Sequence, residues 1–364
     1  MRVKLKDITK FSKGTQINGK NLIDDGAYSY LNGGINPSGK WNEFNVAENT
    51  VTISEGGNSS GYVNYMNDAF WCGAHCYYLY DGPKNSKYLY YALKSQQERL
   101  FRIRSGACMP NIKKSDLGNF IIEYEKDEVR QEEVVKVLEK CELLIEDYNK
   151  KLTLLDEAVR ARFVEMFGDL RINDKGWKYY KLDELTELIT DGEHATPKRT
   201  TQGIYLLSAR NVLNHQLSLE DVDFIDCDEF DRISRRIIPK EGDVLISCSG
   251  SIGRCCIVPK NIKFQMVRSI ALLRFKSNIN PVFAEYMITS DYLQNQINKL
   301  KTASSQANLF QGKIKSLKGV VPPLELQNQF ASFVQEIDKS RSRIQKSLEA
   351  SQELFDSLMQ EYFG

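Results

Sequence analysis

Apolar side chains recur with a four-three spacing in two long stretches of the chain, residues 128–167 and 322–364. Such spacing over four heptads, with charged residues on both flanks, is typical of a coiled-coil seam. We therefore predict two helices of about 36 residues each, or roughly 54 Å at 1.5 Å per residue. Arg341 and Ser351 interrupt the second seam. The predicted seam residues are Val134, Leu138, Ile145, Leu152, Leu155 and Val159 in the first helix, and Phe330, Val334, Ile337, Ile344, Leu348 and Phe355 in the second.

The two helical stretches are copies of each other, and the likeness extends upstream. A shift of 196 residues aligns Gln131 with Gln327, and further identities follow along both helices. The openings of the two halves also agree, because KLKDITKF at 4–11 is similar to KLDELTEL at 181–188. The chain is thus predicted to be two tandem units, each a globular part followed by a long helix.

The globular parts are predicted to be β-rich, with one or two helices each. Short runs such as VTIS, YVNY, DVLISC and SIALLRF are bounded by Gly, Asn, Ser and Pro, which is typical of strands. The predicted fold class is α+β, with two β-rich mixed domains separated by two long helices in a tandem repeat. The predicted limits are 1–125 for the first domain, 126–169 for the first helix, 170–321 for the second domain and 322–364 for the second helix.

Charge alternates along the chain, although the net charge is only +1. The globular parts are mildly basic, with 15 Lys and Arg against 12 Asp and Glu in 1–125, and 22 against 17 in 170–321. The helical parts are acidic, with 8 against 12 in 126–169 and 4 against 7 in 322–364. The acidic and then basic run at 219–243 is interpreted as a solvated face without chemistry.

The chain is predicted to be cytoplasmic and to have no membrane partner. No apolar run approaches the ~20 residues that a spanning helix needs, and the N-terminus lacks the apolar core of a signal peptide. Eight cysteines include no CxxC pair, and the nearest motif, Cys72-x-x-His75-Cys76, lacks the second ligand pair of a zinc site. We predict no metal site, and buried small hydrophobic side chains are the favoured interpretation of these cysteines.

No catalytic constellation is evident, and we predict no catalytic residues. The segments 34–40 and 14–20 come close to a phosphate loop, but neither carries the Ser or Thr that binds Mg²⁺ or opens an evident helix. The chain has only three histidines, which gives little support to a histidine-based catalytic triad or metal centre. No GxGxxG motif follows a strand, so no dinucleotide or S-adenosylmethionine pocket is predicted.

Five segments carry a resemblance that covers essentially the whole chain. They are SGYVNYMNDAFWCGAHCYYLY (60–80), ITDGEHATPKRTTQGIYLLSARNVLN (189–214), KEGDVLISCSGSIGR (240–254), FQMVRSIALLRF (264–275) and PPLELQNQF (322–330). In this order and within a two-fold repeat, the chain resembles the specificity subunit of type I restriction–modification systems. Two departures concern local loop geometry: Asn328 replaces the family's usual Glu, and the first copy, KDEVRQEEV, lacks the double Pro.

The resemblance implies a non-catalytic subunit. In that family two target-recognition domains each read one half of a split sequence in double-stranded DNA, and the two long helices pack as an antiparallel coiled coil between them. The implied partners are two methylation (M) subunits, which bring S-adenosylmethionine, and motor/nuclease (R) subunits, which use ATP and Mg²⁺. No cofactor is expected in this chain itself. The alternatives are a methylation-only complex, a self-contained DNA methyltransferase or nuclease, and a coiled-coil scaffold without DNA contact.

Arg, Lys, Asn, Gln and Ser on loops match the hydrogen-bonding edges of bases, so we expect DNA contacts at such residues. The basic domains should face DNA, and the acidic helices should face protein or solvent. For each candidate the alternative is an ordinary turn or surface residue, and Arg268 could equally pin a loop through a salt bridge. The candidates are Asn32, Asn36, Lys40, Ser59, Ser60, Tyr62, Asn64, His194, Thr196, Lys198, Arg199, Arg210, Asn211, Ser249, Ser251, Arg254, Gln265, Arg268 and Ser269.

Overall fold

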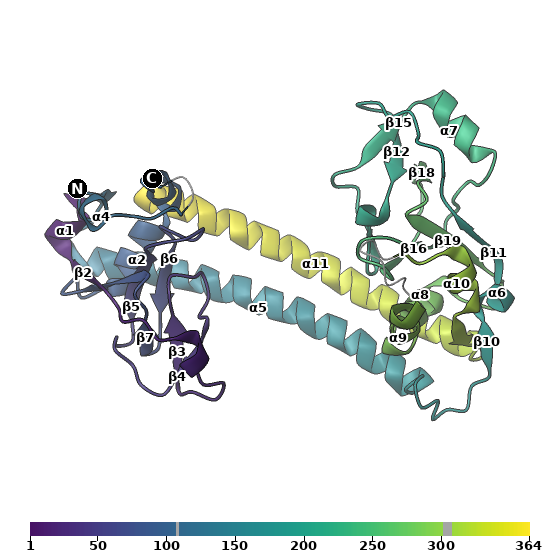
Figure 1. The fold of residues 1–364 in the computed structure, drawn as a ribbon, viewed down its shortest axis with the longest axis horizontal. Coiled ribbons are helices and arrows are strands. Elements are labelled where there is room, and N and C mark those ends of the chain that lie inside the picture. Colours follow the sequence, from purple (N-terminus) through teal and green to yellow (C-terminus); the bar gives the residue numbers. More distant parts are fainter. Residues whose placement is uncertain (107–108, 301–307) are drawn as a thin grey trace. The chain divides into compact units, whose positions relative to one another are not determined.

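The computed structural model describes residues 1–106, 109–300 and 308–364. The chain divides into two compact units, and each is described by itself (Figure 1). The first unit comprises Met1–Lys150 and Ile344–Gly364, and the second comprises Lys151–Arg343. Each long helix therefore contributes one part to each unit.

Among the described residues, three sheets and several short helices form the globular part of the first unit, and the smallest of the sheets is the two-stranded β1-β9. Its strands are β1 (Arg2–Lys4), β2 (Lys10–Lys13), β3 (Tyr28–Leu31), β4 (Gly39–Trp41), β5 (Thr50–Ser54), β6 (Val63–Met66), β7 (Phe70–Cys72), β8 (Cys76–Tyr80) and β9 (Ile121–Glu123). Its helices are α1 (Leu5–Ile8), the 3-10 helix η1 (Gly19–Asn21), α2 (Ser86–Lys94), α3 (Gln97–Arg102), α4 (Lys114–Gly118) and the first part of α5 (Glu128–Phe167). The larger sheet has the antiparallel order β2-β8-β5-β6. In the smaller sheet, β4-β3-β7, β3 pairs antiparallel with β4 and parallel with β7.

The second unit is built in the same way. Its strands are β10 (Tyr179–Lys181), β11 (Thr186–Asp191), β12 (Ile204–Leu207), β13 (Val212–Leu213), β14 (Gln216–Leu217), β15 (Asp223–Ile225), β16 (Val244–Ser247), β17 (Cys255–Ile257), β18 (Phe264–Met266), β19 (Ile270–Phe275) and β20 (Lys318–Val320). Its helices are α6 (Leu182–Leu185), the 3-10 helix η2 (Ala209–Asn211), α7 (Cys227–Ser234), α8 (Pro281–Thr289), α9 (Asp291–Leu300), α10 (Gln311–Ser316) and the first part of α11 (Leu324–Phe363). The sheet orders are β11-β19-β16-β17 and β15-β12-β18.

The two units share one topology. Strand for strand, β2-β8-β5-β6 corresponds to β11-β19-β16-β17, and β4-β3-β7 corresponds to β15-β12-β18. The likeness reaches single hydrogen bonds: the Gln97 side-chain amide donates to the Gly61 carbonyl at 2.7 Å, and the Gln294 amide donates to the Gly253 carbonyl at 2.9 Å. The predicted α+β fold, a tandem repeat of β-rich domains with a pair of long helices, is confirmed.

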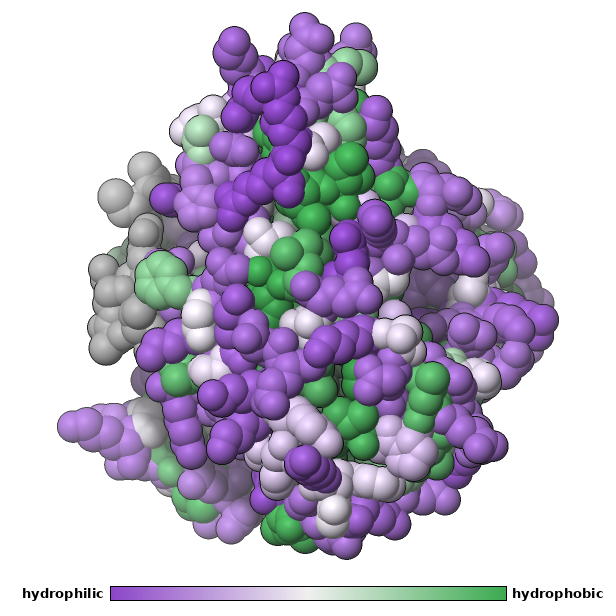
Figure 2. All heavy atoms as spheres, turned by 90° about the vertical axis from the view of Figure 1, so that its right-hand side faces the viewer, coloured by the Kyte–Doolittle hydropathy of each residue, from purple (hydrophilic) through white to green (hydrophobic). Residues whose placement is uncertain are grey.

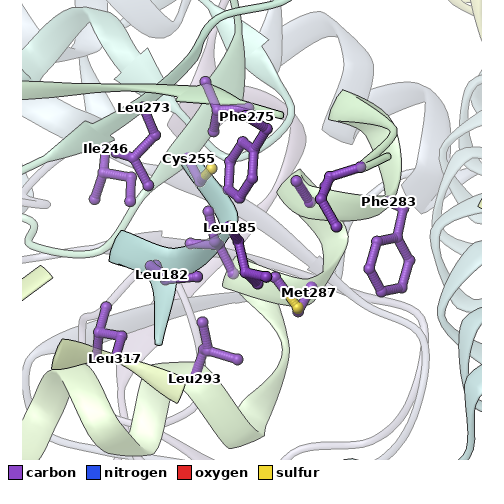
Figure 3. Packing of buried hydrophobic residues seen from close by; sticks show 14 of the residues in the cluster. Leu182, Leu185, Ile246, Cys255, Leu273, Phe275, Phe283, Met287, Leu293 and Leu317 are labelled. Carbon is purple, nitrogen blue, oxygen red and sulfur yellow. The ribbon is translucent and has the colours of Figure 1, made fainter. Parts of the chain in front are cut away.

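The main core of the second unit lies between its four-stranded sheet and the helices α6, α8 and α9 (Figure 3). Ile246 and Leu273 of the sheet face this core, where they pack with Met287 and other fully buried side chains. Their neighbours Leu245 and Leu272 point to the opposite face, into a second cluster shared with the three-stranded sheet. Burial of each such side chain stabilises the fold by roughly 1.5–3 kcal/mol.

The helices α5 and α11 run antiparallel where they meet within the second unit. Phe163 packs on Phe330 with ring centroids 5.4 Å apart, and Asp156 pairs with Arg341 at 2.7 Å. The residue numbers of the contacting pairs therefore increase along α5 while they decrease along α11, as antiparallel packing requires. Phe167 and Phe283 join the same aromatic cluster, with ring centroids 4.7 Å apart, and so anchor α5 to α8.

The same direction holds within the first unit, where Arg130 near the start of α5 lies 5.8 Å from the ring centroid of Tyr362 near the end of α11. The seam residues are shielded from solvent while their charged flanks are exposed. Val134, Leu138, Val159, Phe330 and Val334 are buried, and Ile145, Leu152, Leu155, Ile337, Ile344, Leu348 and Phe355 are half-buried.

Hydrophilic side chains dominate the face of the molecule drawn in Figure 2, and hydrophobic ones form only narrow strips on it. Scattered apolar groups of this kind are normal for a solvated surface. Along the described residues, no helix combines the length and the apolar character needed to cross a bilayer.

Candidate nucleic-acid interface

One edge of each unit collects its loops, and we call it the loop edge. In the first unit β2 and β5 end at this edge and β6 and β8 begin there, because Lys13 pairs with Tyr77 and Ser54 with Cys76. Parallel pairing of β3 with β7 brings the ends of both strands to the same side. The loop edge comprises residues 14–27, 32–38, 55–62 and 73–75 in the first unit, and 192–203, 208–222, 248–254 and 267–269 in the second.

The predicted DNA-contact residues gather at these two loop edges. Three of them lie inside neighbouring strands instead: Lys40 in β4, Asn64 in β6 and Gln265 in β18. The structure therefore brings residues from four separate segments together in each unit. Their individual surroundings divide them into residues that support the loops and residues that face solvent.

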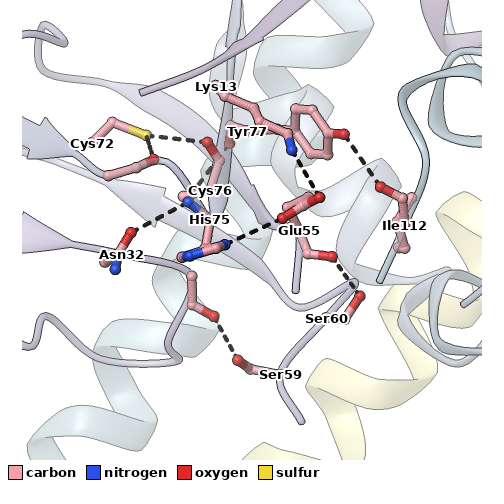
Figure 4. A network of polar contacts seen from close by, with 12 residues as sticks. Lys13, Asn32, Glu55, Ser59, Ser60, Cys72, His75, Cys76, Tyr77 and Ile112 are labelled. Atoms are coloured by element: carbon pink, nitrogen blue, oxygen red, sulfur yellow. Dashed lines mark hydrogen bonds and ion pairs between the residues drawn. The ribbon is translucent and has the colours of Figure 1, made fainter. Parts of the chain in front are cut away.

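Three polar side chains of the first unit tie its loops together (Figure 4). Asn32 Oδ1 accepts the backbone N–H of His75 at 3.2 Å, which joins the loop after β3 to the turn before β8. The Ser59 hydroxyl donates to a carbonyl of the same loop. The Asn64 amide donates to two further carbonyls there, one of them at 3.0 Å. The loop is thus held from both sides, and the exposed Asn36 is presented at its tip.

A largely buried carboxylate, Glu55, lies among these loops (Figure 4). Its Oε1 accepts from Lys13 Nζ at 2.8 Å, and its Oε2 lies 3.5 Å from His75 Nδ1. Its backbone carbonyl accepts the Ser60 hydroxyl at 2.8 Å. Burial, and secondarily the charge of Glu55, raises the pKa of Tyr77 to about 12. The Tyr77 hydroxyl therefore stays protonated at neutral pH and donates to a backbone carbonyl at 3.2 Å.

The cysteines beside this network behave as small buried side chains. The Cys72 thiol donates to the Cys76 carbonyl at 3.4 Å, and both residues are buried. Hydrogen bonding to Cys76, together with burial, raises the pKa of Cys72, and a protonated thiol is a poor metal ligand. His75 is exposed, and its ring faces Glu55 rather than the two thiols. Cys108 lies outside the described residues.

Asp191, at the end of β11, binds two side chains, those of His194 and Arg236. Its Oδ2 lies 2.8 Å from His194 Nε2, and its Oδ1 accepts from the Arg236 guanidinium at 2.6 Å. Both carboxylate oxygens are therefore engaged, and His194 is held in a defined orientation. Asp191 and His194 line a cleft of about 800 Å³ together with Ser249 and Arg268.

Two further arginines of this edge are paired with one acid. Arg199 Nε lies 3.2 Å and Arg210 Nη2 lies 3.3 Å from the carboxylate of Asp223, at the start of β15. Arg210 also reaches Asp221 at 3.5 Å. Exposed pairs of this kind stabilise a protein by about 0–1 kcal/mol, so a phosphate or a base can compete for these guanidinium groups.

Glu229 is a functional support that the sequence analysis did not predict, since its run was interpreted as a solvated face. Its side chain is only 7% exposed and accepts two hydrogen bonds from Arg232, at 2.8 and 2.9 Å. It also accepts the backbone N–H of Lys198 at 3.1 Å, which fastens the loop after β11 to α7. The Arg232 hydrogen bonds lower the pKa of Glu229 to about 2. A Glu at the third position of a short amphipathic helix was the available signal.

Three of the predicted contact residues are corrected by their burial. Ser60, Asn211 and Gln265 are each 0% exposed, so their side chains cannot reach DNA from these positions. Asn211 donates to two carbonyls of the loop that follows it, at 3.2 Å each. Gln265 donates to the Ser234 hydroxyl at 2.8 Å and to the Ile237 carbonyl at 2.9 Å. Their donor groups hold neighbouring segments in shape, although Oε1 of Gln265 has no hydrogen-bond partner among the described residues.

A family model described as the type I restriction modification DNA specificity domain matches residues 1–155 and 174–352. The chain belongs to this family. A Mycoplasma pneumoniae chain that bears the name of a type I specificity subunit is 32% identical over 209 residues, which are 50% of this chain and 56% of that one. The chain thus spans about half the length of this curated relative.

Two further similarities extend over more of the specificity subunit. The specificity subunit of the type I restriction enzyme MjaVIII from Methanocaldococcus jannaschii is 22% identical over 285 residues, which are 71% of this chain and 67% of that one. The crystal structure of the S subunit of a type I restriction-modification system from M. genitalium superposes with a TM-score of 0.68 at 19% identity, covering 100% of this chain and 96% of that one. The second likeness establishes the shared fold. The predicted likeness to type I specificity subunits is confirmed at the level of the family.

Two arginines of the second unit stand apart from the paired ones. Arg254 ends the turn between β16 and β17, and Arg268 lies in the middle of the turn between β18 and β19. Neither guanidinium makes a hydrogen bond or ion pair with the described residues, and Arg268 is exposed. Within 1–106, 109–300 and 308–364, therefore, no salt bridge of Arg268 pins a loop. Gly253, just before Arg254, has φ +90°, a left-handed conformation that favours glycine, and so permits the tight turn.

Proposed function

We propose that this chain is the DNA-sequence specificity subunit of a type I restriction–modification complex and reads a bipartite target in double-stranded DNA. Residues 1–125 would form the reader of one half-site, and residues 170–321 the reader of the other. The observation that carries the proposal is the repeated loop edge, on which one scaffold presents different polar side chains twice. Two such edges in one chain suit a target that is split in two.

The proposed DNA contacts are the candidate residues whose side chains remain accessible. Cationic groups attract phosphates, and amides, hydroxyls and guanidinium groups match base edges in the major groove. The mildly basic domains fit this role, because a reader within a larger complex shares the neutralisation of phosphates with its partners. The set is Asn36, Lys40, Tyr62, His194, Thr196, Lys198, Arg199, Arg210, Ser249, Ser251, Arg254 and Arg268, with Asn32, Ser59, Asn64 and Ser269 as loop supports that are only partly covered.

The helical segments 126–169 and 322–364 are proposed to be the spacer and the docking surface for the other subunits. Their acidic balance makes them poor partners for phosphate. Outside the seam α5 exposes large apolar side chains, among them Leu143 at 64% and Leu154 at 50% exposure. Apolar groups of this kind on a charged helix suit a protein partner. We assign them to two methylation subunits, which supply S-adenosylmethionine, while motor/nuclease subunits supply ATP-dependent, Mg²⁺-dependent cleavage.

Long-read mapping of adenine methylation tests this function directly. The chain would be expressed together with its methylation subunits in a host without adenine methylation. We expect methylated adenines in one sequence made of two short specified halves and an unspecified gap. A control strain with the methylation subunits alone should show no such sequence. A continuous target, or the same methylation without this chain, would contradict the proposal.

The non-catalytic role is tested on the purified chain. Incubated with duplex DNA, S-adenosylmethionine, ATP and Mg²⁺, it should neither methylate nor cleave. Either activity, if it persists through rigorous purification, would favour a self-contained enzyme.

A further inference from the structure

The internal repeat allows the loop edges of the two units to be matched residue by residue. The turns 73–75 and 267–269 have equal length and each joins the third strand of the smaller sheet to the second strand of the larger one. In the first unit the carbonyl of His75 accepts the backbone N–H of Glu55 at 2.8 Å. In the second unit the carbonyl of Ser269 accepts the backbone N–H of Cys248 at 2.8 Å. The two turns therefore occupy the same place in the scaffold.

Two positions of the matched edge carry different chemistry in the two units. The middle residue of the turn is Ala74 in the first unit and Arg268 in the second. The last residue of the neighbouring turn is Tyr62 in the first unit and Arg254 in the second. Both of these accept, through their carbonyls, the backbone N–H of the preceding strand's last residue, at 2.9 Å in each unit. The second unit thus presents arginine at both positions, and the first unit at neither.

The backbone around Arg268 is held from several sides. Its own N–H donates to the Glu193 carbonyl at 3.0 Å, and the N–H of Val267 donates to the Leu207 carbonyl at 3.0 Å. The Ser269 hydroxyl accepts the backbone N–H of the residue that opens η2, at 3.0 Å. Because the backbone is already fixed, only the side chain of Arg268 has to be ordered when it binds a ligand.

Ion pairs separate the other two arginines and His194 of this edge from Arg254 and Arg268, whereas Lys198, like these two arginines, has no ion pair with the described residues. His194, Arg199 and Arg210 each lie within 3.5 Å of an aspartate carboxylate, whereas Arg254 and Arg268 make no ion pair with the described residues. Binding of a base by a paired arginine must displace the carboxylate. An unpaired guanidinium has no carboxylate to displace.

We propose that Arg268 and Arg254 read guanine in the half-site bound by the second unit. The inference rests on the proposed function and names the base that the second domain recognises. The planar guanidinium fork pairs with O6 and N7 of guanine in the major groove, and no other base presents two acceptors there. In the first unit, Ala74 offers no donor, and the ring of Tyr62 lies 3.8 Å from the Lys94 ammonium. The half-site of the first unit is therefore read without arginine at these positions.

The experiment uses the complex with the methylation subunits and a duplex that carries its own methylated sequence. Each guanine of the half-site assigned to the second unit is replaced in turn by 7-deazaguanine, which lacks the N7 acceptor. We expect wild-type affinity to fall by about 10- to 150-fold at one or two of these positions, because the analogue removes one charge-assisted hydrogen bond of the bidentate contact and leaves the one at O6. Arg268→Ala should lower affinity for the unmodified duplex by a similar factor and become insensitive to 7-deazaguanine at one position. Arg268→Lys should lose less affinity than Arg268→Ala but more than a conservative change of charge would predict, because an ammonium can still reach O6 or N7 yet lacks the planar fork.

Lys260→Ala is the matched control. It removes one positive charge from the same domain at the turn between β17 and β18, opposite the loop edge, where Lys260 pairs with Glu241 at 3.4 Å. Its sensitivity to 7-deazaguanine should equal that of the wild type. The duplexes with 7-deazaguanine are then tested in the same way with the Arg254→Ala variant.

Two results would overturn the proposal. One is a wild-type complex whose affinity is unchanged by 7-deazaguanine at every position of that half-site, a result that needs no variant to fold. The other is a uniform loss in Arg268→Ala across all sequences, with the salt dependence reduced by about 0.9 in slope, which identifies a phosphate contact. A wild-type complex that binds no specific sequence at all would instead refute the proposed function.

Discussion

The two long helices should set the length of the gap between the half-sites, and their seam makes this testable. Insertions are placed between Lys150 and Lys151 in α5 and between Arg343 and Ile344 in α11, so that both helices lengthen equally. One heptad in each restores the four-three spacing of the seam, which is shielded from solvent on both sides of these points. Two residues in each would turn the following seam by about 200° and expose it to water. The heptad insertions should fold, and the two-residue insertions should not.

The magnitude follows from helix and DNA geometry. One heptad lengthens a helix by about 10 Å, or roughly three base pairs at 3.4 Å each. It returns the seam to within about 20° of its earlier direction, whereas three base pairs turn the DNA grooves by about 100°. Three heptads add about 31 Å, or roughly nine base pairs, and both rotations then end about 50–60° short of a whole number of turns. Three heptads should therefore match DNA in length and in phase, while one heptad matches it in length alone.

The assay is methylation mapping of both insertion variants beside the wild type. With three heptads we expect unchanged half-sites, a gap longer by about nine base pairs, and near wild-type occupancy. With one heptad we expect a gap longer by about three base pairs and much weaker methylation. A thermal melt of each purified variant shows whether it has folded. A folded, active three-heptad variant that keeps the original gap would refute the view that the helices measure the spacing.

Three further predictions follow from single elements of the fold. Exchanging residues 1–125 for another reader domain should change one half of the methylated sequence; a change in both halves would exclude independent reading. Phe330→Ala should cost about 3–5 kcal/mol of unfolding free energy in urea titration, because its ring is fully buried, whereas the exposed Phe310→Ala should stay within about 0.5 kcal/mol. Glu229 has a pKa near 2 in the fold against an ordinary 4.5, so its stabilisation is complete above pH 4.5 and is lost as the pH falls toward 2. The difference in unfolding free energy between wild type and Glu229→Gln should shrink over that range, and a constant difference would contradict the Arg232 pairing.

Much of the fold was predictable because its signals are periodic or repeated. The four-three spacing predicted two long helices, and the apolar face that it defines on each helix is shielded from solvent in the structure. The offset of 196 residues paired Gln131 with Gln327, and both amides prove to be buried at equivalent helix starts. Each donates to the carbonyl of a residue just before its helix, at 2.6 and 2.8 Å. Strand-like runs such as VTIS were predictable for the same reason, since alternation and flanking turns are local properties.

The candidate site was less predictable because the roles of polar side chains depend on tertiary neighbours. Residue types alone indicated loops rich in Asn, Ser and Arg, and these do lie at the loop edges. Burial of Asn211 and Gln265 depends on partners that fold back from other segments, and no local pattern reveals it. The sharing of Asp223 between Arg199 and Arg210 likewise needs β12 and β15 to be paired first. The residue types therefore indicated the loops at which the candidates lie. They did not indicate which of these side chains are buried or held in ion pairs.

When the bases of the loops are fixed by contacts with the sheets, the side chains at the turn tips can be exchanged without a change of fold. Glycines after β2 and β11 illustrate the fixed part, since a Cβ at Gly14 would lie 1.9 Å from the Cys72 carbonyl oxygen and one at Gly192 would lie 2.3 Å from that of Met266. Both units need glycine there because the loop passes directly over the neighbouring strand. Side chains at the turn tips have no such constraint, as the exposed Arg268 shows. Changes of recognised sequence should therefore arise through substitutions at the turn tips, while substitutions at the supporting glycines, amides and Glu229 should cost stability instead.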